Sequence, residues 1–534
     1  MGAIDALLEH KLASVTLPLA VVLPNGRRIG APDAAVCLRL AELTPLAHLA
    51  AGQVGKLAQD HVEGRLDFDG SVRDLMAIAA QLVVADPTEG AAPLTWWRGL
   101  TRSARSRVRH QVQADAQQVR FHYDLGGHRG DAFYALWLDP RRVYSCGYFR
   151  ELEMSLAQAQ EAKLDHICRK LMLKPGERFL DIGAGWGGLL LWAAERYGVK
   201  AHGITLSENQ HAHVNRLIDE RGLRGRVTMA LCDYRELPET EPFEKIASVG
   251  MFEHVGRARL PEYFAKMHRL LKPGGLLMNH GITAGGTRNH QLGAGIGDFI
   301  ERYIFPGGEL LHVSKVTELM SDAGLEPLDL ENLRPHYART LWAWSDALEA
   351  QLDAARELTR ESVVRAYRVY LAGSAMSFEK GWLCLFQMLA SKPSGDLGDG
   401  PMRGAQSQFP FNRGYMYASD SAVPARPMIY KFKSKATGDV IMMGPAGDEV
   451  LRLIGKSAGA QGIIEVASMA AAIAALEKAV AADESARAEA ESAARAEGKK
   501  AALREGVSLR QRAWPLVEMM KRSMAENAQI VWGV

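Results

Sequence analysis

The stretch Phe179-Leu-Asp-Ile-Gly-Ala-Gly-Trp-Gly-Gly188 decides the fold of this 534-residue chain. Its apolar first half indicates a strand that is covered on both faces. Gly183, Gly185 and Gly187 allow a tight turn and let a ligand approach the backbone closely. Residues 189–196 then resume as a helix, and its first N–H groups have no partner within the helix. The stretch therefore predicts the cofactor turn of a nucleotide-binding fold and leaves the cofactor open.

Outward from this turn, the chain repeats a pattern of strand followed by helix. Strands are expected at 178–182, 199–205, 226–231, 245–251 and 275–282, and helices at 188–197, 208–221 and 259–272. This alternation implies a parallel sheet covered by helices, with ligands beyond the carboxyl ends of the strands. The residues that follow the strands are Gly183 to Gly187, Thr205 to Gln210, Asp233-Tyr234, Glu253-His254 and His280.

The second strand separates two classes of cofactor. In a dinucleotide-binding fold, an acidic residue about 20 residues after the turn binds the ribose hydroxyls. Residues 202–207, His-Gly-Ile-Thr-Leu-Ser, contain no acid, which disfavours a dehydrogenase. The spacing Asp181-x-Gly-x-Gly-x-Gly-Gly, with Leu271-Lys-Pro-Gly-Gly275 further on, resembles methyltransferases that use S-adenosylmethionine (SAM).

Further motifs narrow this resemblance. They are Tyr144-Ser-Cys-Gly-Tyr-Phe149, Gly203-Ile-Thr-Leu-Ser207 with Gln210, Asp233-Tyr-Arg, Met251-Phe-Glu-His-Val255 and Phe299-Ile-x-Arg-Tyr-Ile-Phe-Pro-Gly-Gly308. Together with the glycine turn they resemble the cyclopropane-fatty-acid synthase family over residues 120–392. The resemblance implies an α/β fold: a class I SAM-methyltransferase (Rossmann-like) domain with a mixed, mostly parallel sheet and a helical cap, between small α+β domains at both ends.

The resemblance also implies a reaction, the transfer of a methylene group from SAM to a cis double bond in a phospholipid acyl chain. The sulfonium methyl is already an electrophile, so no enzymic nucleophile is needed. Attack by the alkene leaves a carbocation, and ring closure then requires loss of a proton. The site therefore needs a base, a dry pocket and groups that tolerate a cation, such as aromatic faces. The aromatic candidates are Tyr148, Phe149, Tyr303, Phe305 and Tyr337.

By resemblance the base is a bound bicarbonate ion. Its holders would be Cys146, Glu253, His280, Ile282 and Tyr337. Cys146 would act mainly through its backbone, His280 and Tyr337 would donate hydrogen bonds, and Glu253 would accept the bicarbonate proton. Taken singly, Glu253 is equally explained as an acid at a helix start, and His280 as a satisfied histidine at a strand end.

The resemblance places SAM against a second set of residues. They are Tyr144, Ser145, Asp181, Gly183, Gly185, Gly187, Thr205, Gln210, Asp233 and Tyr234, and no residue is assigned to a metal. Thr205 and Gln210 would serve the ribose or the methionine end. Tyr234 either stacks on the adenine or packs in the core.

Two positions depart from the family pattern. Tyr123-Asp-Leu-Gly-Gly-His-Arg-Gly-Asp-Ala-Phe133 lacks an expected Asn and carries a short insertion at Gly127–Gly130, which bears on the pocket entrance. A cysteine of some members aligns with Ser374. Cys384, ten residues further on, is expected in the core, within an aromatic-rich helical cap over 340–392.

The remaining segments surround this catalytic domain, which is expected over 121–392. We expect an N-terminal accessory domain at 1–90, with a hairpin at Asn25-Gly26, whose residues 20–85 resemble, less specifically, the lipid-handling domain of bacterial members. A basic linker at 91–120 and a Pro/Gly/Ser-rich linker at 393–427 follow the two domains.

The last expected domain, at 428–534, resembles a small bacterial domain of unknown function. It should contain a hairpin at 429–432 and 440–443, a helix pair over 470–504 broken near Gly498, and a last helix interrupted at Pro515. Oligomerisation, for example as a homodimer, or partner docking is the role left open for it.

Composition constrains the partners. A net charge of +2 gives no global field for nucleic acid. Trp96-Trp97 with Arg98, Arg102, Arg105, Arg107 and Arg109 suits an anionic membrane surface, or equally an interdomain helix. The five scattered cysteines and the lack of a signal-peptide pattern or an apolar run near 20 residues favour a cytoplasmic protein. With the Trp/Arg stretch, the expected location is the cytoplasm, in peripheral association with the inner face of the membrane. The rival functions are a methyltransferase that makes methyl-branched acyl chains and a lipid-binding protein without catalysis.

Overall fold

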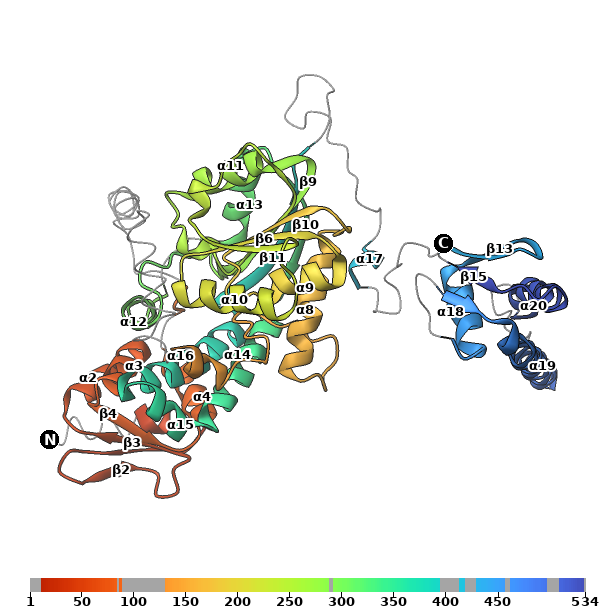
Figure 1. Cartoon of the computed structure of the whole chain (residues 1–534). Helices are drawn as coiled ribbons and strands as arrows, with labels where there is room; N and C mark the ends of the chain where they lie inside the picture. The colour runs from red at the N-terminus through yellow and green to blue at the C-terminus, as the bar shows by residue number, and fades with distance from the viewer. Residues whose placement is uncertain are drawn as a thin grey trace. The chain divides into compact units, whose positions relative to one another are not determined.

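The computed structural model describes residues 11–83, 86–88, 130–287, 292–393, 413–417, 429–456, 462–496 and 509–532. The chain divides into two compact units, Met1–Tyr417 and Ala418–Val534 (Figure 1). The predicted basic linker at 91–120, with Trp96 and Trp97, lies outside the described residues, as does the insertion at 127–129. No helix within the described ranges is long and apolar enough to cross a membrane.

A seven-stranded sheet with the order β10-β11-β9-β8-β5-β6-β7 forms the centre of the first unit. Its strands are β5 (Arg178–Ile182), β6 (Lys200–Thr205), β7 (Val227–Leu231), β8 (Phe243–Val249), β9 (Leu271–Ala284), β10 (Glu326–Asn332) and β11 (Leu383–Ser391). β5 to β9 are mutually parallel, whereas β11 runs antiparallel to both β9 and β10. The predicted α/β class with a mixed, mostly parallel sheet is confirmed.

Helices cover both faces of this sheet because its strands are apolar on both sides. Phe179 of β5 packs in one core cluster with α8 (Leu156–Lys170), α9 (Gly188–Tyr197) and α10 (Glu208–Glu220). Its neighbour Leu180 packs in the other, with α11 (Leu260–Leu270) and α13 (Val313–Asp322). β5 has β6 on one side and β8 on the other, so the chain changes direction across the sheet there. Ligands bind at such a switch point in open α/β sheets.

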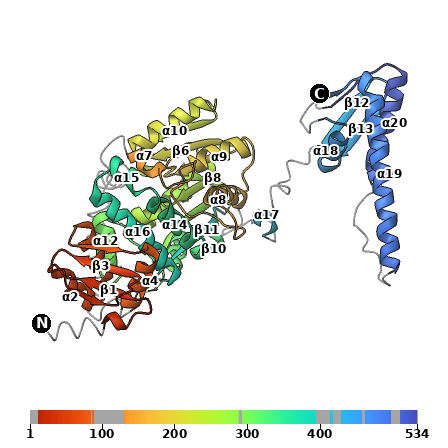
Figure 2. The ribbon, with the colours of Figure 1, turned by 90° about the horizontal axis from the view of Figure 1, so that it is seen from below.

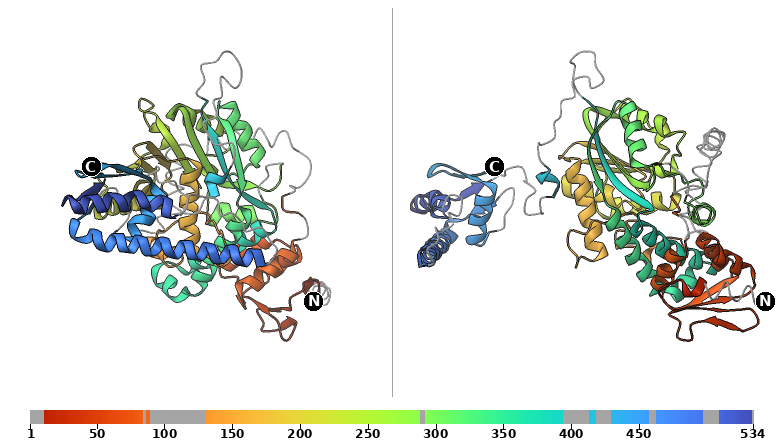
Figure 3. Two further views of the ribbon diagram at one scale, coloured as in Figure 1. Left: turned by 90° about the vertical axis from the view of Figure 1, so that its right-hand side faces the viewer. Right: turned by 180° about the vertical axis from the view of Figure 1, so that it is seen from behind.

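The predicted helical cap ends in a strand, so that prediction is wrong for its last part. α14 (Arg334–Glu349), α15 (Leu352–Leu358) and α16 (Glu361–Glu379) form the helices, and β11 then enters the sheet between β9 and β10 (Figure 3). Cys384 accordingly lies in a strand, half-buried, opposite Thr283 of β9. The reason is that a short apolar run has no periodicity to separate a buried strand from a buried helix.

The N-terminal part forms a four-stranded sheet with the order β2-β1-β3-β4. Its elements are β1 (Leu19–Val22), β2 (Arg28–Gly30), β3 (Val36–Leu40), β4 (Leu66–Asp69), α2 (Thr44–Ala50), α3 (Val54–Val62) and α4 (Val72–Leu82). The predicted hairpin is confirmed by the antiparallel pairing of β1 with β2. The core of this part includes Ala372 and Met376 of α16, so it packs directly on the cap (Figure 2).

Part of the predicted linker at 393–427 is a short helix, α17 (Gly414–Tyr417). Met416 is buried in the core that contains α8, and its carbonyl oxygen lies 3.0 Å from Nδ1 of His166. Arg413 pairs with Asp329 of β10 at 2.8 Å. This piece of the chain is therefore anchored on the first unit.

The second unit is a separate α+β fold with the sheet order β13-β12-β15-β14. Its elements are β12 (Ile429–Ser434), β13 (Thr437–Met443), β14 (Gly462–Ile464), β15 (Ile530–Trp532), α18 (Gly444–Leu453), α19 (Val466–Ala496) and α20 (Leu509–Ala525). The predicted hairpin is confirmed as β12 and β13. The predicted interruption at Pro515 is wrong, since α20 continues through it while Leu516 and Val517 stay buried in the core. The predicted break near Gly498 falls outside the described residues.

Candidate active site

The glycine turn after β5 has three residues with left-handed backbone angles: φ is 72° at Gly183, 56° at Gly185 and 82° at Gly187. A side chain is strained at such angles. A Cβ on Gly185 would meet nothing nearer than the Gly183 carbonyl oxygen at 4.0 Å, so this face of the turn is open. A Cβ on Gly187 would lie 2.9 Å from Val214 of α10. Gly187 therefore serves helix packing, whereas Gly183 and Gly185 face a cavity.

That cavity, which we call the cofactor cavity, has a volume of about 160 Å³ and lies at the carboxyl ends of the parallel strands. The structure brings nine of the ten residues predicted for SAM to its wall. They are Tyr144, Ser145, Asp181, Gly183, Gly185, Thr205, Gln210, Asp233 and Tyr234. The tenth, Gly187, lies one position before the lining residue Gly188.

Several polar side chains in the cofactor cavity are held by partners from the protein itself, whereas Oδ2 of Asp181 is buried without a hydrogen-bond partner among the described residues. The Thr205 hydroxyl donates to Oε1 of Gln210 at 2.7 Å. The Asp233 carboxylate accepts from the guanidinium of Arg235 at 2.6 Å. Tyr234 lines the cavity and packs edge-on against Tyr263, with ring centroids 5.3 Å apart. It thus fits both of its predicted roles.

A buried lysine below the turn was missed at the level of sequence. Lys163 of α8 is 1% exposed, and its ammonium donates to the Ser145 hydroxyl at 2.9 Å. Burial lowers the pKa of Lys163 to about 8 and raises the pKa of Asp181 to about 7, although the charge of Lys163 opposes the second shift. The available signal was a lysine on the sheet-facing side of an amphipathic helix.

A second cavity, the catalytic cavity, has a volume of about 430 Å³. All five residues predicted to hold the base line it: Cys146, Glu253, His280, Ile282 and Tyr337. They come from the segment before α8, the short helix η2 (Phe252–His254), β9 and α14. The two cavities share a wall formed by Tyr144, Ser145, Gly250 and His254. A donor in one cavity therefore faces an acceptor in the other.

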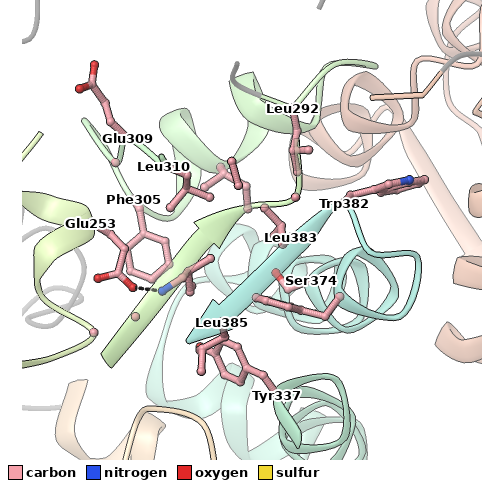
Figure 4. Close-up of a pocket in the computed structure, with 18 of the residues that line it drawn as sticks. Glu253, Leu292, Phe305, Glu309, Leu310, Tyr337, Ser374, Trp382, Leu383 and Leu385 are labelled. Carbon is pink, nitrogen blue, oxygen red and sulfur yellow. Dashed lines mark hydrogen bonds between the residues drawn. The ribbon is translucent and has the colours of Figure 1, made fainter. Parts of the chain in front are cut away.

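Glu253 is anchored by one oxygen and unpaired at the other. Its Oε1 accepts the backbone N–H of Ile282 at 2.6 Å (Figure 4). Its Oε2 is buried without a hydrogen-bond partner in the described part of the chain. Burial raises the pKa of Glu253 to about 7. A Cβ at Gly281 would lie 2.7 Å from Oε1, so glycine is required for this close approach.

His280 is fully buried in β9, and neither ring nitrogen has a hydrogen-bond partner among the described residues. Burial lowers the pKa of His280 well below its ordinary value, so the ring is neutral at pH 7. A neutral imidazole carries one donor and one acceptor, and leaving both unpaired in the interior costs free energy. Together with Oε2 of Glu253, this set fits a small ligand that both accepts and donates hydrogen bonds, such as a protonated oxyanion.

The thiol of Cys146 is suited to structure and not to attack. Its sulfur donates to the carbonyl oxygen of Gly147 at 3.1 Å, and burial raises its pKa. A thiol with a raised pKa carries little thiolate, the nucleophilic form. The expectation that no thiol nucleophile operates agrees with this geometry.

The structure places two of the five aromatic candidates in the catalytic cavity. Phe305 and Tyr337 line it, together with Tyr370 of the aromatic-rich cap, which was not among those five candidates. Tyr148 instead stacks on His166 and His336, with centroids 4.3 and 4.8 Å away. The Tyr303 hydroxyl donates to Glu63 at 2.5 Å, and Phe149 packs under the guanidinium of Arg339. Ser374 lines the cavity.

Comparisons with known proteins show which family and which relatives this chain is similar to. The family described as mycolic acid cyclopropane synthetase matches residues 110–388, and a domain of unknown function (DUF1840) matches residues 428–532. A probable fatty acid methyltransferase of Pseudomonas putida is 41% identical over 392 residues, covering 73% of this chain and 96% of that protein. The probable fatty acid methyltransferase Rv3720 of Mycobacterium tuberculosis is 33% identical over 422 residues, covering 73% and 95%. The solved structure of the cyclopropane synthase MmaA2 from Mycobacterium tuberculosis is 37% identical, covers 52% of this chain and 98% of its own, and superimposes with a TM-score of 0.49.

Proposed function

Because the chain belongs to the mycolic acid cyclopropane synthetase family, we propose that it converts cis double bonds of unsaturated fatty acyl chains in membrane phospholipids to cyclopropane rings. The single observation that carries this proposal is the pair of cavities that share one wall. One has the polar lining suited to SAM, and the other presents Glu253 and His280 with unpaired buried atoms.

SAM is the proposed methyl donor, and when bound it supplies a methyl group already activated as an electrophile. Gly185 leaves the turn open to it, and Thr205, Gln210 and Asp233 are the polar groups that would hold its ribose and methionine ends. The named residues stay in place through their own hydrogen bonds, so little order has to be created on binding.

Bicarbonate is the proposed base, and when bound it supplies an oxygen that accepts the proton lost on ring closure. His280 would donate a hydrogen bond to the ion, and Oε2 of Glu253 would accept the proton of its hydroxyl. Burial keeps His280 neutral, so its ring offers one donor and one acceptor, and burial places the pKa of Glu253 at about 7, so this carboxyl can gain or lose a proton near neutral pH.

The apolar side chains of the catalytic cavity would exclude water from the carbocation. Leu341, Leu385 and Phe378 are among the apolar residues that line the catalytic cavity. The ring faces of Phe305 and Tyr370 offer cation–π attraction, worth about 2 kcal/mol when desolvated. A dry cavity prevents capture of the cation by water, which would give an alcohol.

A methyl-branched chain is the second candidate product, favoured by the naming of two relatives as probable fatty acid methyltransferases. It would arise from the same carbocation by loss of a different proton followed by reduction. The reductant would have to come from another protein or cofactor.

Mass spectrometry of phospholipids from a host that lacks the activity tests the proposal. Expression should raise the mass of monounsaturated chains by one CH₂ group, and the products should be acid-labile as cyclopropanes are. Acid-stable products that are two hydrogens heavier than the cyclopropane would establish the reduced branched chain instead. An unchanged lipid profile, with folded protein present, would contradict both.

Removing dissolved CO₂ should slow turnover of the purified protein by about tenfold or more, and added bicarbonate should restore it.

We also propose that the protein associates peripherally with the inner face of the membrane through Trp96-Trp97 and the arginines from Arg98 to Arg109. Replacing Arg102, Arg105, Arg107 and Arg109 with Ser should weaken sedimentation with anionic vesicles, and the difference should shrink at high salt. Equal sedimentation of both proteins would show that the arginines do not bind the membrane and have a structural role.

A homodimer is the proposed assembly, and sedimentation velocity of the full chain tests it.

A further inference from the structure

A third cavity adjoins the catalytic cavity in the N-terminal part of the first unit. We call it the N-terminal cavity, and its volume is about 130 Å³. Five residues line both cavities: Leu292, Ile300, Tyr370, Ser374 and Leu383. Because these residues line both cavities, the two cavities are neighbours, and a long ligand in the catalytic cavity would reach the N-terminal cavity by passing between these side chains.

The lining of the N-terminal cavity is suited to hydrocarbon. Side chains from the N-terminal sheet and helices, such as Leu19, Phe68 and Ile78, meet side chains from α12 (Ile296–Tyr303) and α16. None of the described residues that line it carries a charge at pH 7. His61 is 2% exposed, and burial lowers its pKa to about 4, so its ring is neutral. A polar head group would be desolvated here without compensation.

We propose that the N-terminal cavity receives the methyl end of the acyl chain while the double bond lies beside Glu253 and His280. This inference rests on the proposed function of the catalytic cavity. The direction of the chain follows from charge, since Arg257, Glu301 and Glu309 line another part of the catalytic cavity and suit the polar end of a lipid. An apolar cavity of roughly 150 Å³ holds a molecule the size of benzene, so about six carbons of the tail fit here.

Gly373 of α16 keeps this cavity open. It lies inside a helix without a positive φ, where glycine destabilises the helix relative to alanine. No close backbone approach requires it either, because an added Cβ would meet only the sulfur of Met76, at 3.8 Å. A larger side chain at position 373 would therefore project into the space lined by both residues, and the helix would tolerate it.

Three acyl chains test the assignment. Palmitoleoyl and cis-vaccenoyl chains share the same length beyond the double bond, and oleoyl has two more carbons there. Oleoyl and palmitoleoyl share the same length on the carboxyl side. In Gly373→Leu, kcat/KM for oleoyl should fall about tenfold relative to palmitoleoyl, because two methylenes lose their site, while the ratio of cis-vaccenoyl to palmitoleoyl should stay unchanged. Met76→Ala, which enlarges the cavity, should instead raise kcat/KM for oleoyl relative to palmitoleoyl.

Gly438→Leu is the matched control, since it adds the same side chain at an exposed position of the second unit with no atom within 4 Å. Equal loss on all three chains in folded Gly373→Leu would overturn the assignment, as would unchanged ratios. A change confined to cis-vaccenoyl against palmitoleoyl would reverse the proposed direction of the chain. Displacement of a bound fluorescent fatty acid by the same three chains gives the ratios without turnover. If the wild-type protein binds these chains but transfers no methylene group, the proposed function is wrong. The binding ratios of the three chains then still decide whether the N-terminal cavity holds the methyl end.

Discussion

The cofactor cavity and the catalytic cavity share a wall and differ in how their polar groups are satisfied. In the cofactor cavity, Thr205 pairs with Gln210 and Asp233 pairs with Arg235, while Oδ2 of Asp181 has no hydrogen-bond partner in the described residues. In the catalytic cavity, both nitrogens of His280 and Oε2 of Glu253 are buried without a partner in the described residues. The paired side chains of the first cavity are therefore held in place before a ligand binds, whereas His280 and Glu253 of the second cavity gain partners for these atoms only when a ligand binds.

This difference affects the free energy of ligand binding in each cavity. Paired groups hold the geometry for a ligand that must be bound and released at every turnover. Unpaired buried groups raise the free energy of the empty site, and a ligand that pairs with them recovers that cost on binding. A small ion can therefore bind strongly despite making few contacts.

His280→Ala should break the comparison most severely. Removal of the imidazole takes away the donor to the proposed base, so methyl transfer from radiolabelled SAM into lipid should fall about 10³-fold. The affinity for SAM, measured by calorimetry, should change less than about twofold because the cofactor cavity is untouched. His268→Ala, a half-buried histidine of α11 outside both cavities, is the control. Normal turnover in His280→Ala would refute the role of this residue.

Glu253→Gln should sharpen the comparison through stability. A pKa raised from 4.5 to about 7 stabilises the folded state fully below pH 4.5, and this contribution is lost as pH rises through 7. Burying the ionised carboxylate costs free energy above pH 7, and the uncharged Gln side chain avoids this cost. The variant should therefore be more stable than the wild type by up to about 3 kcal/mol near pH 8 and equal to it near pH 4. Denaturant unfolding at several pH values measures this difference. A pH-independent difference would show that Glu253 does not titrate in the folded protein.

Thr205→Val should have the smallest effect, and it changes the cofactor cavity, not the catalytic cavity. It removes the hydroxyl that donates to Gln210 and leaves the volume unchanged, so the Kd for SAM should rise about tenfold. The rate at saturating SAM should stay close to that of the wild type. A lower rate at saturation, with an unchanged Kd, would place Thr205 in the chemical step and not in binding.

The central part of the fold was predictable because its signals are local. β5 and α9 match the predicted residues 178–182 and 188–197, since an apolar strand, a glycine turn and a helix follow one another directly. β11 was missed because its pairing with β9 joins positions about a hundred residues apart, and nothing in its own apolar run separates strand from helix.

The candidate site shows the same limit. Glycine spacing and strand ends located Asp181, Thr205 and Asp233, but the grouping of Cys146, Glu253 and Tyr337 came from family resemblance. Lys163 was missed because its burial depends on how α8 packs on the sheet. Tyr148 was misplaced because its neighbours His166 and His336 are remote in sequence.

The wall of Tyr144, Ser145, Gly250 and His254 has a consequence for the order of addition. Because each substrate would enter its own cavity, neither has to leave before the other can bind. The thiol at this junction is protonated and buried, so no covalent methyl-enzyme stage is available to it. Steady-state kinetics should accordingly show a ternary complex, with intersecting double-reciprocal plots and not the parallel lines of a ping-pong enzyme.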